Sequence, residues 1–217
     1  MEAIPGIGAR MYSWIHRISP VSKKLFHEIA EEITSQNISG AVLDIGTGPG
    51  SLVLEIAKLN PGIEVVGIDL SKEMIAIAYE NKNRVLPEGH AEFQVANASS
   101  IPFADEYFDF IVSTMSMHHW AEPEKCLKEL ARVLKKNGIV WIYDIRRDAT
   151  AENTARIRKK YGWFLAHIAL PVIRLHSSLT LKNASETISA SSTGLSITGI
   201  AEKAFLLRIE ARHLSSS

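Results

Sequence analysis

The stretch that decides the fold is Val42-Leu43-Asp44-Ile45-Gly46-Thr47-Gly48-Pro49-Gly50, and a second apolar run, residues 64–69, ends in Asp69. An apolar run with one carboxylate that leads into a glycine-rich turn is typical of a buried parallel strand, and the glycines let a ligand lie against backbone N–H groups of the turn. Between the two runs, residues 51–59 have apolar side chains at helical spacing. The order strand, loop, helix, strand, acid predicts a nucleotide-binding site.

The spacing of the glycines indicates the kind of nucleotide. A dinucleotide fingerprint is G-x-G-x-x-G, whereas Gly46, Gly48 and Gly50 alternate with other residues and Asp44 lies just upstream. A carboxylate there would repel a pyrophosphate and attract an ammonium group. The sequence therefore favours a ligand with a cationic end. A nicotinamide-dependent oxidoreductase is the alternative by fold, disfavoured because Gly50 comes one residue too early for the fingerprint.

S-adenosylmethionine carries such a cationic end. The sequence resembles the class I S-adenosylmethionine-dependent methyltransferases, in particular the small-molecule group that includes the ubiquinone and menaquinone biosynthesis methyltransferases. The resemblance covers residues 40–145 well and residues 180–212 moderately, and its motifs are residues 42–50, 65–71, 97–103, 108–113, 118–120 and 127–142.

This resemblance implies a single methyltransferase domain over residues 1–217 with an α/β, Rossmann-like fold. Its seven-stranded mixed sheet would have strand order 3-2-1-4-5-7-6 with strand 7 antiparallel, helices on both faces, a helical cap (residues 1–38) and a lid insertion (residues 146–178). We expect strands at residues 42–45, 64–69, 91–96, 108–114, 139–145, 195–201 and 204–212. Helices are expected at residues 51–59, 71–85, 123–135, 151–161 and 180–192, the third closed by Lys135-Lys136-Asn137-Gly138.

The resemblance also assigns residues to the cofactor, S-adenosyl-L-methionine. Asp69 would accept hydrogen bonds from both ribose hydroxyls, although it could instead cap the following helix. Met74 could lie in the core or beside the adenine, and Tyr12 could contact the cofactor or simply attach the cap. The full predicted set is Tyr12, Asp44, Gly46, Thr47, Gly48, Gly50, Asp69, Leu70, Met74, Asn97, Ala98 and Ser113.

Asn97 departs from the family pattern. The usual residue is Asp, whose carboxylate accepts from the adenine amine. Asn keeps one acceptor oxygen, so we expect the hydrogen bond to survive in a weaker, neutral form.

The loop after the fourth strand, residues 115–120, should face the reacting methyl group. His118 and His119 are the predicted catalytic residues, which could orient the acceptor or take its proton, or could serve only loop packing. No Cys or Asp/Glu at ligand spacing accompanies them, so no metal is expected. Asp144 could touch the acceptor or form a salt bridge with Arg146 or Arg147.

Composition narrows the partners. Lys+Arg and Asp+Glu both number 24 in 217 residues, so no global field favours nucleic acid, and a small-molecule acceptor is expected. The apolar run at residues 163–175 is too short to span a bilayer, so we expect no integral membrane segment. With neither a signal peptide nor a second cysteine beside Cys126, a cytoplasmic protein is predicted, which could form a homodimer.

The sequence thus predicts an enzyme that methylates a small molecule by in-line displacement. Within the lid, Trp163, Phe164 and His167 could line the acceptor pocket or could be plain packing. A non-catalytic partner subunit that binds the cofactor is the alternative from another class, because Asn97 and residues 146–178 match the family poorly.

Overall fold

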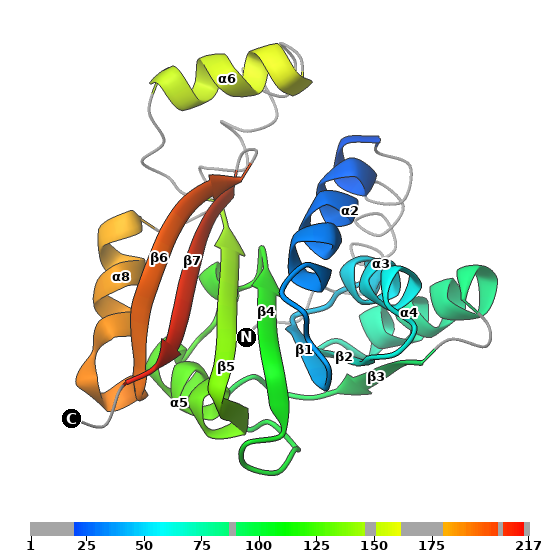
Figure 1. The fold of residues 1–217 in the computed structure, drawn as a ribbon, viewed down its shortest axis with the longest axis horizontal. Coiled ribbons are helices and arrows are strands. Elements are labelled where there is room, and N and C mark those ends of the chain that lie inside the picture. Colours follow the sequence, from blue (N-terminus) through cyan, green and yellow to red (C-terminus); the bar gives the residue numbers. More distant parts are fainter. Residues whose placement is uncertain (1–19, 87–89, 146–150, 162–179, 204–205, 215–217) are drawn as a thin grey trace.

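A sheet of seven strands runs through the part of the chain that the structure, a computed structural model, describes: residues 20–86, 90–145, 151–161, 180–203 and 206–214. The strand order is β3-β2-β1-β4-β5-β7-β6, with β7 antiparallel to both of its neighbours and the other pairs parallel (Figure 1). The predicted α/β fold and strand order are therefore confirmed. The strands are β1 (Ala41–Ile45), β2 (Glu64–Asp69), β3 (Ala91–Val95), β4 (Phe108–Thr114), β5 (Leu134–Asp144), β6 (Leu195–Lys203) and β7 (Leu206–His213).

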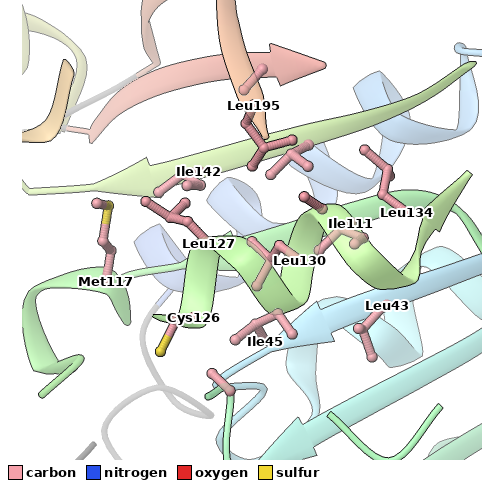
Figure 2. Packing of buried hydrophobic residues seen from close by; sticks show 14 of the residues in the cluster. Leu43, Ile45, Ile111, Met117, Cys126, Leu127, Leu130, Leu134, Ile142 and Leu195 are labelled. Carbon is pink, nitrogen blue, oxygen red and sulfur yellow. The ribbon is translucent and has the colours of Figure 1, made fainter. Parts of the chain in front are cut away.

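Helices cover both faces of the sheet, because the side chains of its inner strands alternate between two apolar clusters. Val42 of β1 and Val112 of β4 pack with α2, α3 and α4, whereas Leu43 and Ile111 pack with α5 and α8. Figure 2 shows the second of these clusters, with α5 lying across the sheet. The helices are α2 (Pro20–Thr34), α3 (Ser51–Leu59), α4 (Lys72–Val85), α5 (Pro123–Val133), α6 (Ala151–Tyr161) and α8 (Leu181–Ser189), with short 3₁₀ turns η1 (Met117–His119) and η3 (Ser191–Thr193).

The predicted end of α5 was wrong. The helix stops at Val133, and residues 135–138 belong to β5 instead of closing the helix. Leu134 already has extended backbone angles, φ −78° and ψ 133°, is fully buried, and pairs with Phe108. Lys135 then reaches Asp109, with Nζ 2.7 Å from Oδ2. Tertiary packing of Leu134 thus outweighs the local preference for a longer helix.

The predicted last helix is divided. Thr180 is its N-cap, with Oγ1 accepting from the N–H of Asn183 at 3.1 Å, and α8 ends at Ser189. A 3₁₀ turn follows, and Gly194, at φ 76°, leads into β6.

The strand order reverses between β1 and β4. In open α/β sheets, ligands bind at such a reversal, beyond the carboxyl ends of the strands.

Candidate active site

The glycine loop that joins β1 to α3 needs glycine for its backbone conformation. Gly46, Gly48 and Gly50 have φ of 71°, 52° and 77°, in the left-handed region that residues with a side chain rarely adopt. A Cβ on Gly46 would also lie 2.1 Å from Ser116 Oγ, and one on Gly50 would lie 2.6 Å from Phe93 Cζ. A Cβ on Gly48 would meet nothing within 4 Å. The loop is therefore held both by its conformation and by close packing on β3 and the turn after β4.

The N–H groups of this loop are engaged by the protein itself. Gly46 and Thr47 donate to the carbonyl of Ile68 at 2.8 and 3.0 Å, and the Gly50 N–H donates to the Thr47 carbonyl at 3.0 Å. The Gly48 N–H donates to Asp69 Oδ2 at 2.9 Å. The expectation that a ligand lies against these N–H groups stays a prediction, although each already has an acceptor within the protein. For the same reason they do not form a set of free donors for a pyrophosphate.

Asp44 lies beneath the loop as a buried acceptor that still needs a donor. The side chain is 2% exposed, and Oδ1 has no hydrogen-bond partner among the described residues. Burial raises the pKa of the Asp44 carboxyl from 3.8 to about 7. The nearby Thr47 hydroxyl offsets part of this rise in pKa, and the charge of Asp69 adds a smaller one. A buried carboxylate without enough donors is costly, so a ligand with a positively charged donor would stabilise it.

Three further buried oxygens, in the loop after β1 and at the end of β4, share this condition. Within the described residues, Thr47 Oγ1, Ser113 Oγ and Thr114 Oγ1 also have no hydrogen-bond partner. Ser113 and Thr114 end β4, and Ser113 pairs with Ile45 at the end of β1. The unpartnered oxygens therefore gather at the carboxyl ends of β1 and β4, where strand order reverses. These groups fit a polar ligand such as the predicted cofactor.

Asp69 at the end of β2 connects the loop to the next helix. Its Oδ1 accepts from the Ser71 N–H at 2.9 Å and its Oδ2 from the Gly48 N–H at 2.9 Å, while burial raises its pKa. The helix cap is Ser71, whose Oγ accepts from the Met74 N–H at 3.2 Å. Asp69 is thus not the cap of α4, and its contact with the ribose hydroxyls stays a prediction.

The adenine end of the predicted site lies beside Asp69. The Ala96 N–H donates to the carbonyl of Asp69 at 3.0 Å, which brings the loop after β3 next to β2. Asn97 Oδ1 accepts from the Ser99 N–H at 3.0 Å, so this oxygen has one lone pair left for an adenine amine.

The apolar residues predicted around the adenine are largely buried. Met74 is 2% exposed and Ala98 is 1% exposed. Leu70 is half-buried. Their predicted contacts with the cofactor stay predictions.

His118 has a partner that the sequence did not predict. Its Nδ1 lies 2.7 Å from Oδ1 of Asp144, and its backbone N–H donates to Asp144 Oδ2 at 3.1 Å. The sequence left Asp144 either to touch the acceptor or to form a salt bridge with Arg146 or Arg147, both of which lie outside the described residues. The usable signal was topological: one residue follows β4 and the other ends β5, and these strands are neighbours. The rings of His118 and His119 are 4.0 Å apart.

Other predicted residues lie outside the described part of the chain. These are Tyr12 of the cap and Trp163, Phe164 and His167 of the lid.

Cys126 is described and lies buried in the apolar cluster that includes α5. Burial raises the pKa of its thiol to about 11, which is typical of a packed core cysteine. Among the described residues, no group of three His, Cys, Asp or Glu side chains could hold a metal ion. No described helix is both long and apolar enough to cross a bilayer.

Known proteins share this chain's motifs and fold. Residues 43–142 match the family described as "Methyltransferase domain". The chain is 38% identical over 100 residues to the ubiquinone/menaquinone biosynthesis C-methyltransferase UbiE of Geotalea uraniireducens, covering 46% of this chain and 43% of that protein. It is 32% identical over 146 residues to UbiE of Citrifermentans bemidjiense, covering 66% and 62%.

Among solved structures, a SAM-dependent methyltransferase from Aquifex aeolicus superposes with a TM-score of 0.72 at 21% identity, covering 98% of this chain and 100% of that one. At this identity the likeness shows the fold. The chain spans about half the length of the first curated relatives that it matches.

Proposed function

Because this chain belongs to the class I S-adenosylmethionine-dependent methyltransferases, in the group similar to UbiE, we propose that it transfers a methyl group from S-adenosyl-L-methionine to a small-molecule acceptor. When bound, the cofactor supplies a methyl group on a positively charged sulfur, which an acceptor takes by in-line displacement. Proteins catalyse such transfers chiefly by holding the acceptor close to the methyl carbon and excluding water.

The observation that carries the proposal is Asp44 beneath the glycine loop. Its unpartnered Oδ1, at 2% exposure of the residue, supports an ionic contact with an ammonium group. The loop N–H groups that already donate within the protein argue against a diphosphate in the same place. Asp69 would hold the ribose, and Asn97 with Ala98 would meet the adenine.

The acceptor site would lie beyond the carboxyl ends of β4 and β5. We place His118 and His119 there, with α2 of the cap and α6 of the lid above the sheet. Lys160 of α6 forms an ion pair with Glu28 of α2, with Nζ 3.4 Å from Oε2. This contact supports an acceptor site covered by the cap and the lid together. Relatives named as ubiquinone/menaquinone biosynthesis C-methyltransferases support a small molecule as acceptor. A homodimer stays a prediction.

Calorimetric titration tests the cofactor. Heat of binding is expected with S-adenosylmethionine and with its demethylated product, and none with NADH. Absence of heat from both methionine-derived ligands at millimolar concentration would contradict the proposal, whereas binding of NADH alone would favour the nicotinamide-dependent alternative.

Methyl transfer is tested with a donor that carries a tritium-labelled methyl group and a broad set of phenols, quinols, amines and thiols. Labelled product from the isolated chain supports the proposed activity. If the chain binds the cofactor but methylates nothing until a copurifying protein is added, the non-catalytic partner subunit becomes the better account.

A further inference from the structure

The turn that carries His118 is held in place by contacts on several sides. Met117, 4% exposed, is buried in the cluster beneath α5 (Figure 2). Trp120 Nε1 donates to Ser116 Oγ at 3.2 Å. Met115 has φ 53°, a left-handed conformation that non-glycine residues seldom adopt without tertiary support. These contacts fix the direction in which the His118 side chain leaves the turn.

The carboxylate of Asp144 fixes the orientation of the imidazole ring. It is buried, with its side chain 2% exposed, and accepts from three N–H groups: His118 Nδ1 at 2.7 Å, the His118 backbone at 3.1 Å and the Ile145 backbone at 2.7 Å. A ring nitrogen that faces a carboxylate carries the hydrogen, so the lone pair of the neutral ring lies on Nε2. The His118 side chain is 13% exposed, which gives the ring access to a small molecule.

The turn that carries His118 contacts the glycine loop. A Cβ on Gly46 would come within 2.1 Å of Ser116 Oγ, so the turn after β4 touches the glycine loop two residues before His118. His118 therefore lies two residues beyond a contact with the glycine loop, in the turn that follows the unpartnered oxygens of Ser113 and Thr114.

We propose that His118 is the general base of this site, that Asp144 is its positioning residue, and that the acceptor is a neutral molecule with an ionisable hydroxyl, such as a phenol or an enol. This inference rests on the proposed function. An acceptor with a ready lone pair, such as a thioether or a tertiary amine, has no proton to give and would not need this pair. Among the described residues, Asp144 and His119 are titratable neighbours of His118, and the His119 ring is 4.0 Å from the His118 ring.

The step balances in protons and charge. The hydroxyl proton of the acceptor moves to His118 Nε2, and the electron pair released on oxygen forms a bond to the methyl carbon. The bond between that carbon and the donor sulfur breaks, and its electron pair stays on sulfur. The sulfonium thereby loses the positive charge that the imidazolium gains, and the Asp144 carboxylate that faces the ring stabilises the imidazolium.

The ring tautomer tests the pair without any reaction. Nitrogen-15 NMR of the imidazoles, with the His118 signals assigned through the His118→Gln variant, should show hydrogen on Nδ1 and a bare Nε2 in the neutral ring. Asp144→Asn should shift His118 toward the Nε2–H tautomer, because the Asn amide can donate to Nδ1. A wild-type ring with hydrogen on Nε2, or a tautomer unaffected by Asp144→Asn, would overturn the proposal.

Kinetics with substituted phenols of graded acidity supply the second readout. For weakly acidic phenols, His118→Gln and Asp144→Asn should lower kcat by about a hundredfold or more with little change in KM. The loss should shrink for phenols that are already ionised at the assay pH. The matched control is His90→Gln, an exposed histidine just before the amino end of β3, which should retain wild-type kcat.

The outcomes separate the two proposals. Absence of calorimetric binding of S-adenosylmethionine to the wild-type chain means that the proposed function fails. If the cofactor binds and thioethers are methylated but phenols are not, or if the loss is equal for ionised and neutral phenols, only the inference about His118 and Asp144 fails.

Discussion

Asp44 and Asp144 are two buried carboxylates, each near the carboxyl end of a parallel strand, that differ in how fully the protein satisfies them. Asp144 accepts three N–H hydrogen bonds, two of them from His118. Asp44 is equally buried, but its Oδ1 has no donor among the described residues. Their side chains also lie on opposite faces of the sheet, because Asp44 shares a face with Val42 of one apolar cluster and Asp144 shares a face with Ile142 of the other.

The difference in hydrogen-bond donors indicates two different roles for the carboxylates at the carboxyl ends of the strands. A carboxylate that the protein leaves short of donors destabilises the empty fold and is ready for a cationic ligand. A carboxylate that is fully hydrogen-bonded instead orients a neighbouring side chain. On this account Asp44 holds the cofactor, whereas Asp144 acts on the acceptor through His118.

The largest expected effect comes from exchanging the two carboxylates for amides. Asp44→Asn should weaken S-adenosylmethionine binding about a hundredfold or more, since the ammonium loses its buried partner. Asp144→Asn, the matched control, should change that affinity by less than about threefold. Calorimetric titration of both variants checks this, and equal losses in the two would erase the distinction between them.

A second prediction concerns the loop above Asp44. Gly50→Ala should lower the free energy of unfolding by about 3 kcal/mol, because a left-handed φ of 77° is combined with a Cβ 2.6 Å from Phe93 Cζ. Gly48→Ala is the control with a φ of 52° and open space. It should cost only about 1 to 2 kcal/mol. Urea denaturation measures both, and a Gly48→Ala variant as unstable as Gly50→Ala would show that the close contact does not matter.

Titration of Asp44 should make the stability of the cofactor-free protein depend on pH. Its pKa is raised to about 7 in the folded chain, so the folded state holds a proton that the unfolded state has lost between about pH 4 and pH 7. Stability of the cofactor-free protein should therefore fall as pH rises through that window. Asp44→Asn should flatten that part of the profile. Thermal denaturation across the window, without cofactor, tests this, and identical slopes for wild type and variant would be evidence against a titrating Asp44.

Cofactor affinity should change with pH in the opposite direction. The ammonium prefers the ionised carboxylate, so binding of S-adenosylmethionine should weaken roughly tenfold between pH 8 and pH 6 for a pKa of about 7. Calorimetry at the two pH values measures it, and Asp44→Asn should show a flat response.

The smallest expected effect comes from Asn97, which stands where the family usually has Asp. Asn97→Asp keeps the oxygen that accepts from the Ser99 N–H and adds a charge-assisted acceptor for the adenine amine. S-adenosylmethionine should bind about fivefold more tightly, which corresponds to about 1 kcal/mol. A decrease in affinity on this change would place the adenine elsewhere.

The bounds of several helices and strands could be predicted, because their apolar patterns end at residues that break regular structure. The bounds of α3, β2 and β4 agree with the expected ranges. The boundary between α5 and β5 could not be predicted, because the residues around Leu134 favour a helix locally. What makes Leu134 extended is its burial and its pairing with Phe108, which the local pattern does not contain.

The site divides in the same way. Asp44, Asp69 and the three glycines form a local pattern that the sequence displays directly. The pairing of His118 with Asp144 joins two strands through the sheet, so spacing along the chain does not reveal it. Nor could the sequence show that the N–H groups of Gly46 and Thr47 are taken by Ile68 of the neighbouring strand.

Carbon-13 NMR of the Asp44 side-chain carboxyl tests the central claim most directly, with the signal assigned through Asp44→Asn. In the cofactor-free protein this carboxyl should titrate near pH 7, and saturating S-adenosylmethionine should lower its midpoint by more than about one unit. A carboxyl that titrates at the same pH with and without bound cofactor would contradict the claim that Asp44 binds the cationic end of the methyl donor.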